Sequence, residues 1–262
     1  MKIQILGTGS SGNSTVITDG NTKIVLDCGL SLKQELLRSK IDLSYVNAIF
    51  ISHAHTDHSH YLLDILKYSN ATLYIHKETF MELKDAYRFN FNGVKVQFIE
   101  NDKKYLIENI CVFTMKLSHD CKNCNGFIFV SQNDYSSFAY ISDTGIVPTL
   151  YLDLLKKVDA MAIEANHDIE MLNESKRPRF LKDRILSYSG HLSNIACGEF
   201  LDKIIQNGKL KQVFLVHLSR ECNEEKLAID TILDLINSDR LPRFYISKQD
   251  EALEVIEVCH EN

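Results

Sequence analysis

Short apolar runs, bounded by glycine and polar turn residues, dominate the first half of the chain. Runs of this length that are rich in β-branched residues are typical of strands. They predict strands over residues 2–6, 14–18, 23–26, 47–51, 72–75, 94–99, 110–117, 126–131 and 137–141. Asp19, Gly20 and Asn21 form a turn signal between two of these runs, so we expect the chain to begin as β-hairpins.

Helical periodicity enters between the strands and becomes stronger in the second half. It predicts helices over residues 61–67, 150–157, 194–206 and 224–237, with strands at 160–163 and 213–216 and a final pair after residue 241. Strands and helices in both halves favour an α/β fold of two sheets covered by helices on their outer faces. No repeat, linker or low-complexity tract interrupts the pattern, so residues 1–262 are predicted to be a single domain.

Composition excludes several classes of protein. The 262 residues are 45% apolar and 24% charged, which excludes a disordered or fibrous chain. A net charge of −6 does not suggest a protein that coats nucleic acid by bulk charge, although it is compatible with a local basic patch. No run approaches the ~20 apolar residues of a membrane span, and the first apolar run is too short for a secretory signal. We therefore expect a cytoplasmic protein without a membrane partner.

The seven cysteines are scattered and odd in number, which indicates free thiols in a reducing compartment. Cys121 and Cys124 form a C-x-x-C pair. A structural zinc site would need a second pair, which the sequence lacks, so the pair is interpreted as two incidental loop cysteines.

Residues 7–12, Gly-Thr-Gly-Ser-Ser-Gly, match the dinucleotide fingerprint, and Asp27 lies at the spacing of its acidic residue. That fingerprint requires a helix directly after the glycines. Residues 13–20 are instead β-branched and end in a turn. We therefore interpret the loop as a tight connection between strands that lines a pocket, and expect no nucleotide cofactor.

The most informative segment follows the apolar run at 47–51, where His, Asp and His side chains gather in H-x-H-x-D-H spacing. Imidazole and carboxylate groups are the ligands that Zn²⁺ and similar divalent ions prefer. The four side chains are His53, His55, Asp57 and His58. Since Asp57 and His58 are adjacent, they point away from the first two histidines, and this one loop can serve two metals.

This motif resembles the signature of the metallo-β-lactamase superfamily, and three later motifs match in order. They are His119 after an apolar strand, Asp143 in Ser-Asp-Thr-Gly, and His217 after a late strand. The resemblance implies an αββα sandwich of two mixed β-sheets and two divalent metal ions, Zn²⁺ or Mn²⁺. It also implies that His53, His55 and His119 hold one ion, that Asp57, His58 and His217 hold the other, and that Asp143 bridges them.

Two further motifs resemble the phosphodiesterase branch of this superfamily, which includes tRNase Z. Glu164 stands in Glu-Ala, and His191 stands in Gly-His-Leu-Ser. In that branch such a pair donates a proton to the leaving alkoxide, since a carboxylate can keep a histidine protonated near pH 7. With Asp57, they are the predicted catalytic residues. The alternative is that the segment merely caps a helix through Ser193 or Asn194.

Over most of the chain the motifs resemble the YycJ/WalJ-like exonucleases. The resemblance implies a nuclease that attacks DNA from the 5′ end, with metal-bound hydroxide as the nucleophile. Two features depart from the pattern. Cys121 and Cys124 occupy a loop where a short run ending in proline is expected. The Gly- and Pro-rich arm with which tRNase Z grips tRNA has no counterpart, which disfavours tRNA processing.

A basic stretch at residues 176–184 stands out in this acidic chain, and phosphate contacts are one interpretation of it. The other is a solvated helix face paired with Glu170 and Glu174. The predicted substrate contacts are Arg177, Arg179, Lys182, Ser10, Ser11, Asn13, Ser193 and Ser219.

Two other functions remain open from the sequence. A small-molecule phosphodiesterase that acts on cyclic nucleotides, as phage anti-defence proteins do, fits the acidic charge. A non-catalytic binding module is disfavoured because every ligand position is filled. Nucleic acid ends or a nucleotide are thus the expected partners, and the resemblance also allows a homodimer.

Overall fold

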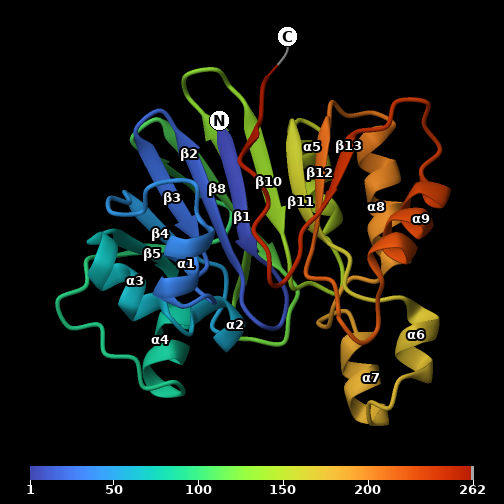
Figure 1. Ribbon diagram of the computed structural model, residues 1–262, viewed down its shortest axis with the longest axis horizontal. Helices are drawn as coiled ribbons and strands as arrows, with labels where there is room; N and C mark the ends of the chain where they lie inside the picture. The colour runs from blue at the N-terminus through green and yellow to red at the C-terminus, as the bar shows by residue number, and fades with distance from the viewer. Residues whose placement is uncertain (261–262) are drawn as a thin grey trace. The chain divides into compact units, whose positions relative to one another are not determined.

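The structure is a computed structural model and describes residues 1–260 (Figure 1). The chain divides into two compact units that alternate along the sequence. Unit 1 contains Met1–Lys116, Cys121–Ser137 and the chain from Ser247 onward, and unit 2 contains Leu117–Asp120 and Phe138–Ile246.

The first sheet has seven strands and belongs to unit 1. In spatial order it contains β14 (Ile256–Glu257), β1 (Lys2–Gly7), β2 (Ser14–Asp19), β3 (Thr22–Leu26), β4 (Ala48–Ile51), β5 (Thr72–His76) and β6 (Val96–Ile99). The strands from β14 to β3 pair antiparallel, and those from β3 to β6 pair parallel. The predicted opening hairpins are confirmed, and Gly20 adopts the positive φ of 57° that their turn requires.

The second sheet also has seven strands, in the order β13 to β7. Its members are β7 (Lys104–Ile107), β8 (Ile110–Leu117), β9 (Cys124–Ser131), β10 (Ser137–Ile141), β11 (Ala160–Glu164), β12 (Gln212–Val216) and β13 (Arg243–Ile246). Strands β10 to β13 run parallel, so their carboxyl ends share one edge. The predicted pair of mixed sheets is confirmed.

Helices follow the parallel strands in both units. Unit 1 contains α1 (Leu32–Arg38), α2 (Thr56–Ser59), α3 (Leu62–Ser69) and α4 (Lys77–Asp85). Unit 2 contains η1 (Thr149–Tyr151), α5 (Leu152–Leu155), α6 (Ile169–Glu174), α7 (Arg179–Ile185), α8 (Asn194–Ile205) and α9 (Glu225–Leu235), of which α8 and α9 pack together (Figure 1). Periodicity did not predict α1, α2, α4, α6 and α7, which have 4 to 9 residues each.

The core of unit 1 packs directly beneath the strand that leads into the metal-binding motif. Buried residues of β4, β5 and α3, among them Ile49, Leu73 and Leu66, form one continuous apolar cluster. Residues beyond the carboxyl end of β4 are thereby held on a rigid support. Among the described residues, no helix combines the length and the apolar character of a membrane span. None of the seven cysteines, all of which lie within residues 1–260, forms a disulfide.

Candidate metal centre

Three polar residues at strand ends adopt the left-handed backbone conformation. Asp27 follows β3, Asp143 follows β10 and His217 follows β12, with φ of 63°, 55° and 59°. A non-glycine residue in this region costs roughly 1–3 kcal/mol. Five other non-glycine residues of the described chain, among them Asn70 and Asp102, share this conformation, so it does not by itself mark a functional site. Two of the three strand-end residues are predicted metal ligands, and the third, Asp27, is one that the sequence did not assign.

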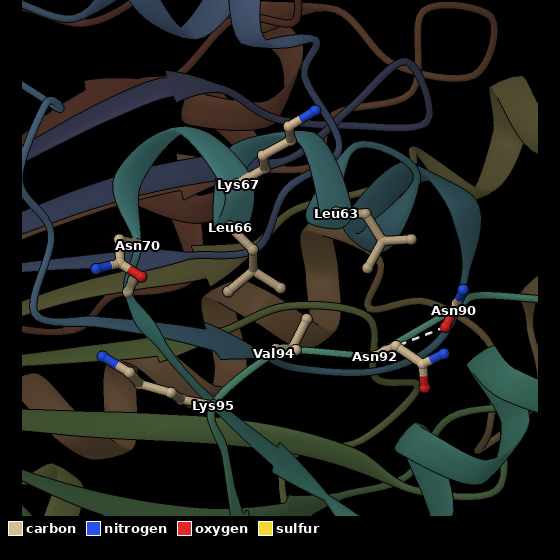
Figure 2. A pocket seen from close by; sticks show the side chains of 10 residues that line it. Leu63, Leu66, Lys67, Asn70, Asn90, Asn92, Val94 and Lys95 are labelled. Carbon is tan, nitrogen blue, oxygen red and sulfur yellow. Dashed lines mark hydrogen bonds between the residues drawn. The ribbon is translucent and has the colours of Figure 1, made fainter.

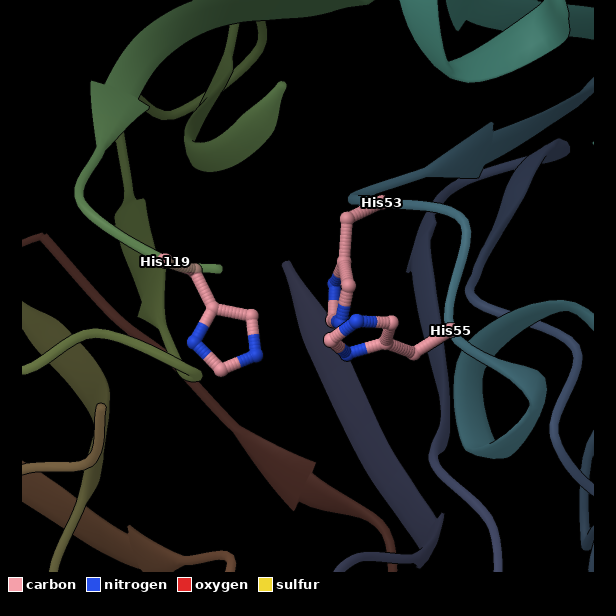
Figure 3. Close-up of side chains that lie close together, drawn as sticks. All are labelled: His53, His55 and His119. Atoms are coloured by element: carbon pink, nitrogen blue, oxygen red, sulfur yellow. The ribbon is translucent and has the colours of Figure 1, made fainter. Parts of the chain in front are cut away.

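The H-x-H-x-D-H segment of unit 1 gathers its side chains at the end of β4. The ring of His53 lies 4.7 Å from that of His55 and 4.2 Å from that of His58. Nε2 of His58 lies 3.5 Å from Oδ2 of Asp57. Figure 3 shows the His53 and His55 rings pointing toward one another. The segment therefore presents several ligand atoms in one place.

Asp27 orients the His58 ring through its Nδ1 atom. Its Oδ2 accepts a hydrogen bond of 2.6 Å from Nδ1 of His58, and its Oδ1 accepts one of 2.8 Å from the Ser52 amide. All three residues are buried. A carboxylate at Nδ1 places the ring proton there, so Nε2 is the ring's acceptor atom; it lies 2.9 Å from Nδ2 of Asn13 and is the atom that would ligate a metal.

The glycine-rich loop holds the metal segment through its backbone. The Asn13 amide donates to the carbonyl of Asp57 at 2.7 Å, and Nδ2 of Asn13 lies 3.2 Å from Oδ2 of Asp57. A Cβ on Gly29 would lie 1.8 Å from that same carbonyl, and one on Gly12 would lie 2.5 Å from the Gly29 oxygen. The glycines thus permit close backbone approach, in agreement with the predicted strand-to-strand turn.

Unit 2 brings a second group together at the shared edge of β10, β11 and β12. Asp143, Glu164, His191 and His217 each offer a ligand atom, and these four atoms lie within 4.8 Å of one another. Nε2 of His217 lies 3.4 Å from Oδ1 of Asp143. Nε2 of His119 lies 3.9 Å from the same oxygen, while its Nδ1 faces the Gly190 carbonyl at 3.1 Å. Parallel strands bring these distant residues to one place.

Glu164 and His191 form a buried pair beside Asp143. Nδ1 of His191 lies 2.7 Å from Oε1 of Glu164, whose Oε2 accepts from the Thr144 amide at 3.0 Å. Burial by itself would raise the pKa of Glu164, but the charge of His191 and hydrogen bonds from His191 and His217 lower it. Burial would likewise lower the pKa of His191, but the charge and hydrogen bond of Glu164 raise it. The pair therefore favours a carboxylate beside an imidazolium.

These donors fit a divalent ion. Ligand atoms that share one ion at about 2 Å lie within about 4 Å of one another, and the contacts of Asp143 with His119 and His217 meet that limit. His58 and His119 also have Nδ1 engaged by protein oxygens, which directs Nε2 outward for ligation.

The basic stretch is largely paired within unit 2. Arg177 lies 2.8 Å from Glu221, and Arg179 lies 2.8 Å from Asp183. Arg184 pairs with Asp120, which is adjacent to His119. Lys182 donates to two backbone carbonyls at 2.6 and 2.7 Å. The partners are therefore not Glu170 and Glu174.

The predicted serine contacts lie on loops and helix ends. Ser10 is exposed, and Ser11 donates to Gln249 at 2.9 Å. Ser193 accepts from the Ala196 amide at 3.1 Å and caps α8, whereas Ser219 accepts from the Cys222 amide at 3.2 Å. Ser193 thus caps α8, as the alternative interpretation of this segment predicts, and Glu164 and His191 are in contact in the same structure.

Three supporting residues escaped the sequence interpretation. Asp27 was considered only for the dinucleotide fingerprint, although its place directly after a strand was a usable signal. Asn166 lies with Nδ2 3.1 Å from Nδ1 of His217, and Asp120 has Oδ1 3.3 Å from Nε2 of His119. Neither has a spacing that distinguishes it from an ordinary loop residue.

Comparison with known proteins agrees with this geometry. Residues 22–218 match the family described as the beta-lactamase superfamily domain. The chain is 32% identical over 240 residues to exodeoxyribonuclease WalJ of Streptococcus pneumoniae serotype 2 (strain D39 / NCTC 7466), covering 89% of this chain and 87% of that protein. It is 29% identical to exodeoxyribonuclease YycJ of Bacillus anthracis, covering 87% and 86%. Among solved structures, the metallo-beta-lactamase fold protein YhfI of Bacillus subtilis aligns with a TM-score of 0.73 at 14% identity, over 97% of this chain and 99% of that one.

The two mixed sheets and the clustered His, Asp and Glu side chains define a metal-dependent hydrolase. Most of the chain matches the family above, and similarity to the two exodeoxyribonucleases extends over nearly the same length. The chain belongs to the metallo-β-lactamase superfamily.

Proposed function

We propose that this protein is a dinuclear-metal exonuclease that hydrolyses phosphodiester bonds at DNA ends, from the 5′ end. The observation that carries the proposal is the buried Glu164–His191 pair beside Asp143, with 2.7 Å between Nδ1 and Oε1. Hydrolysis of a phosphodiester expels an alkoxide that needs a proton, and this pair is built to donate one. Similarity to two exodeoxyribonucleases over nearly 90% of the chain supports DNA as the substrate.

The proposed ligands follow the family pattern. His53, His55 and His119 would hold one ion, Asp57, His58 and His217 would hold the other, and Asp143 would serve both. Two divalent ions, Zn²⁺ or Mn²⁺, supply Lewis acidity and a nucleophilic hydroxide near neutral pH when bound. Asp27 and Asn13 orient His58 and Asp57, and this support is what the unit 1 hydrogen bonds indicate.

The proton donor works through its orientation. Because Glu164 engages Nδ1 of His191, Nε2 remains for the leaving oxygen. Glu164 is fully buried, whereas the His191 side chain is 18% exposed, so the histidine is the member of the pair that a substrate can reach. Thr144 and His217 hold the carboxylate in place.

We propose Arg177 and Arg179 as phosphate contacts. Their partners Glu221 and Asp183 are about half exposed, and exposed ion pairs contribute little, so exchange for a phosphate costs little. Lys182, Ser10, Ser11, Asn13, Ser193 and Ser219 stay predictions as substrate contacts. Location in the cytoplasm and assembly as a homodimer are also proposals, and light scattering of the purified protein tests the second.

The deciding experiment compares substrates on protein reconstituted with Mn²⁺ or Zn²⁺. We expect release of nucleotides from 5′-labelled DNA, little turnover of cyclic nucleotides, and metal loading near two ions per chain. Asp143→Asn keeps a residue that tolerates positive φ but is expected to lose most activity and at least one ion. Turnover of cyclic nucleotides alone would overturn the nuclease proposal in favour of the small-molecule alternative.

The proton-donor role has its own test. His191→Ala should keep its metal content yet lose about 10²–10⁴-fold in rate on DNA. It should lose far less on bis(p-nitrophenyl) phosphate, whose leaving group needs no proton. His260→Ala, in a histidine outside both clusters, serves as the control. An equal loss on both substrates would contradict general-acid catalysis by His191.

A further inference from the structure

A pocket of about 300 Å³ in unit 2 shares its walls with the loops that carry Asp143 and His191. Its lining residues come from the segment after β10, the loop before α8, and α8 itself; they include Gly145, Val147, Leu152, Tyr188, Leu192 and Phe200. No predicted site residue lines it. A second pocket, of about 340 Å³ in unit 1, lies between α3 and residues 90–95 and contains no motif residue (Figure 2).

The unit 2 pocket lies next to the loop that carries Asp143 because two backbone atoms approach Gly145 closely. A Cβ on Gly145 would lie 2.2 Å from the Ser187 oxygen and 2.5 Å from the Tyr188 carbonyl carbon. Only glycine lets the Tyr188 loop lie directly on the Asp143 loop. Gly145 is two residues from Asp143, at most about 7 Å along the chain, and Leu192 is adjacent to His191. Two lining residues, Gly145 and Leu192, are therefore chain neighbours of the proposed metal ligand Asp143 and the proposed proton donor His191.

The chemistry of the lining matches a flat heterocycle. Leu152, Leu192 and Phe200 are buried or half-buried apolar walls. Tyr188 at the rim is 78% exposed, so its ring is accessible from solvent. Glu199 and Lys203, both exposed on α8, offer an acceptor and a cation at the other side.

We propose that this pocket holds the base of the nucleotide next to the scissile bond, with Tyr188 stacked on it. The inference rests on the proposed exonuclease function and deepens it. Aromatic side chains bind bases of any sequence through their π-faces, which suits an enzyme that removes successive nucleotides. A volume near the lower end of ligand pockets admits one base but not several. Lys203 also suits an anionic strand better than an apolar protein surface.

The test pairs a protein variant with a substrate variant. Tyr188→Ala should raise KM for a short single-stranded oligonucleotide by about tenfold, which is the contribution of one stacked base to binding. The value of kcat should change less. For the wild-type enzyme, KM should rise by the same factor when the oligonucleotide carries an abasic residue at its end. Tyr188→Ala should then no longer distinguish the two oligonucleotides. Tyr188→Phe should behave as wild type.

Three comparisons separate a base pocket from a structural role. Tyr45→Ala removes a ring of similar exposure, 61%, in unit 1 and should change nothing. Ala196→Phe should fill the pocket from α8 and reproduce the Tyr188→Ala defect with Tyr188 intact. The abasic oligonucleotide presents no ring to the pocket, so its KM should be the same in wild type, Tyr188→Ala and Ala196→Phe.

Binding can be followed without turnover because the chain contains no tryptophan. Tyr188→Trp introduces a single tryptophan. Its emission should be quenched by the oligonucleotide with a base and not by the abasic one. Equal effects of Tyr188→Ala on both oligonucleotides would overturn the base pocket. A dimer that Tyr188→Ala converts to monomer in light scattering would assign the surface to a second copy instead. Base-dependent quenching without DNA cleavage would overturn only the exonuclease proposal, and no oligonucleotide binding would overturn both.

Discussion

Asp27 illustrates at the scale of one residue how the fold prepares a ligand. Its backbone has a φ of 63°, and its carboxylate accepts hydrogen bonds from both His58 and Ser52. A carboxylate that orients a ligating histidine commonly contributes about 10–100-fold to metal affinity. The strain at Asp27 is thus the cost of directing Nε2 of His58.

Asp27→Asn should weaken metal binding by about 10–100-fold while leaving the fold intact. Asparagine tolerates positive φ but lacks the negative charge that holds the His58 proton on Nδ1. Metal titration with a competing chelator measures the loss, and circular dichroism checks the fold. Asp102→Asn is the matched control, since Asp102 is exposed and has a similar φ of 59°. Unchanged affinity in Asp27→Asn would contradict the orienting role.

At the scale of an element, helix α1 carries a carboxyl group that the fold buries completely. Glu35 has no exposed surface, and its neighbours are Ser14, Cys28 and Arg38. Burial raises its pKa from 4.5 to about 8, which the Ser14 hydroxyl and the Arg38 charge only partly offset. The folded state therefore binds a proton that the unfolded state releases between these values.

This shift predicts a stability that falls as pH rises from about 4.5 to about 8. The sign follows because the folded protein binds more protons in that window. Glu35→Gln should remove this dependence. The difference in free energy of unfolding, variant minus wild type, should therefore be about 2–4 kcal/mol larger at pH 9 than at pH 5. Urea unfolding at both pH values measures the difference. Glu170→Gln, at an exposed site, should parallel wild type, and a parallel curve for Glu35→Gln would refute the prediction.

At the scale of the whole molecule, the two units are interleaved along the chain. The backbone passes between them after residues 116, 120, 137 and 246. Neither unit is a continuous segment, so neither can fold from a contiguous piece of sequence. This connectivity supports the proposal that residues 1–262 behave as a single domain.

Calorimetry should therefore record one unfolding transition, both with and without metal. Each bound ion at about 100 times its Kd should add about 2.7 kcal/mol, or roughly 5–10 °C for a chain of this size. Removal of metal by a chelator should reverse that gain without splitting the transition. Two resolved transitions would contradict the single-domain proposal.

The sequence by itself determined the strands of the first sheet whose apolar runs and turn residues are neighbours in the chain. The alternation of short apolar runs and turns predicts β1 to β5 within a residue or two, because strand burial and turn chemistry are local properties. The motif H-x-H-x-D-H identified a metal segment for the same reason: its ligands are neighbours in the chain. Short polar helices such as α4 and α7 leave no comparable signal.

Only the tertiary structure decided which distant side chains support the motif residues. Glu164 and His191 meet at 2.7 Å because β11 and the loop before α8 converge, and Asp27 meets His58 because β3 and β4 are parallel neighbours. The pairing of Arg177 with Glu221 and of Arg184 with Asp120 was equally invisible, since both partners are remote in sequence. Spacing along the chain encodes contacts within a turn or a loop, whereas contacts between strand ends depend on sheet order, which no single segment carries.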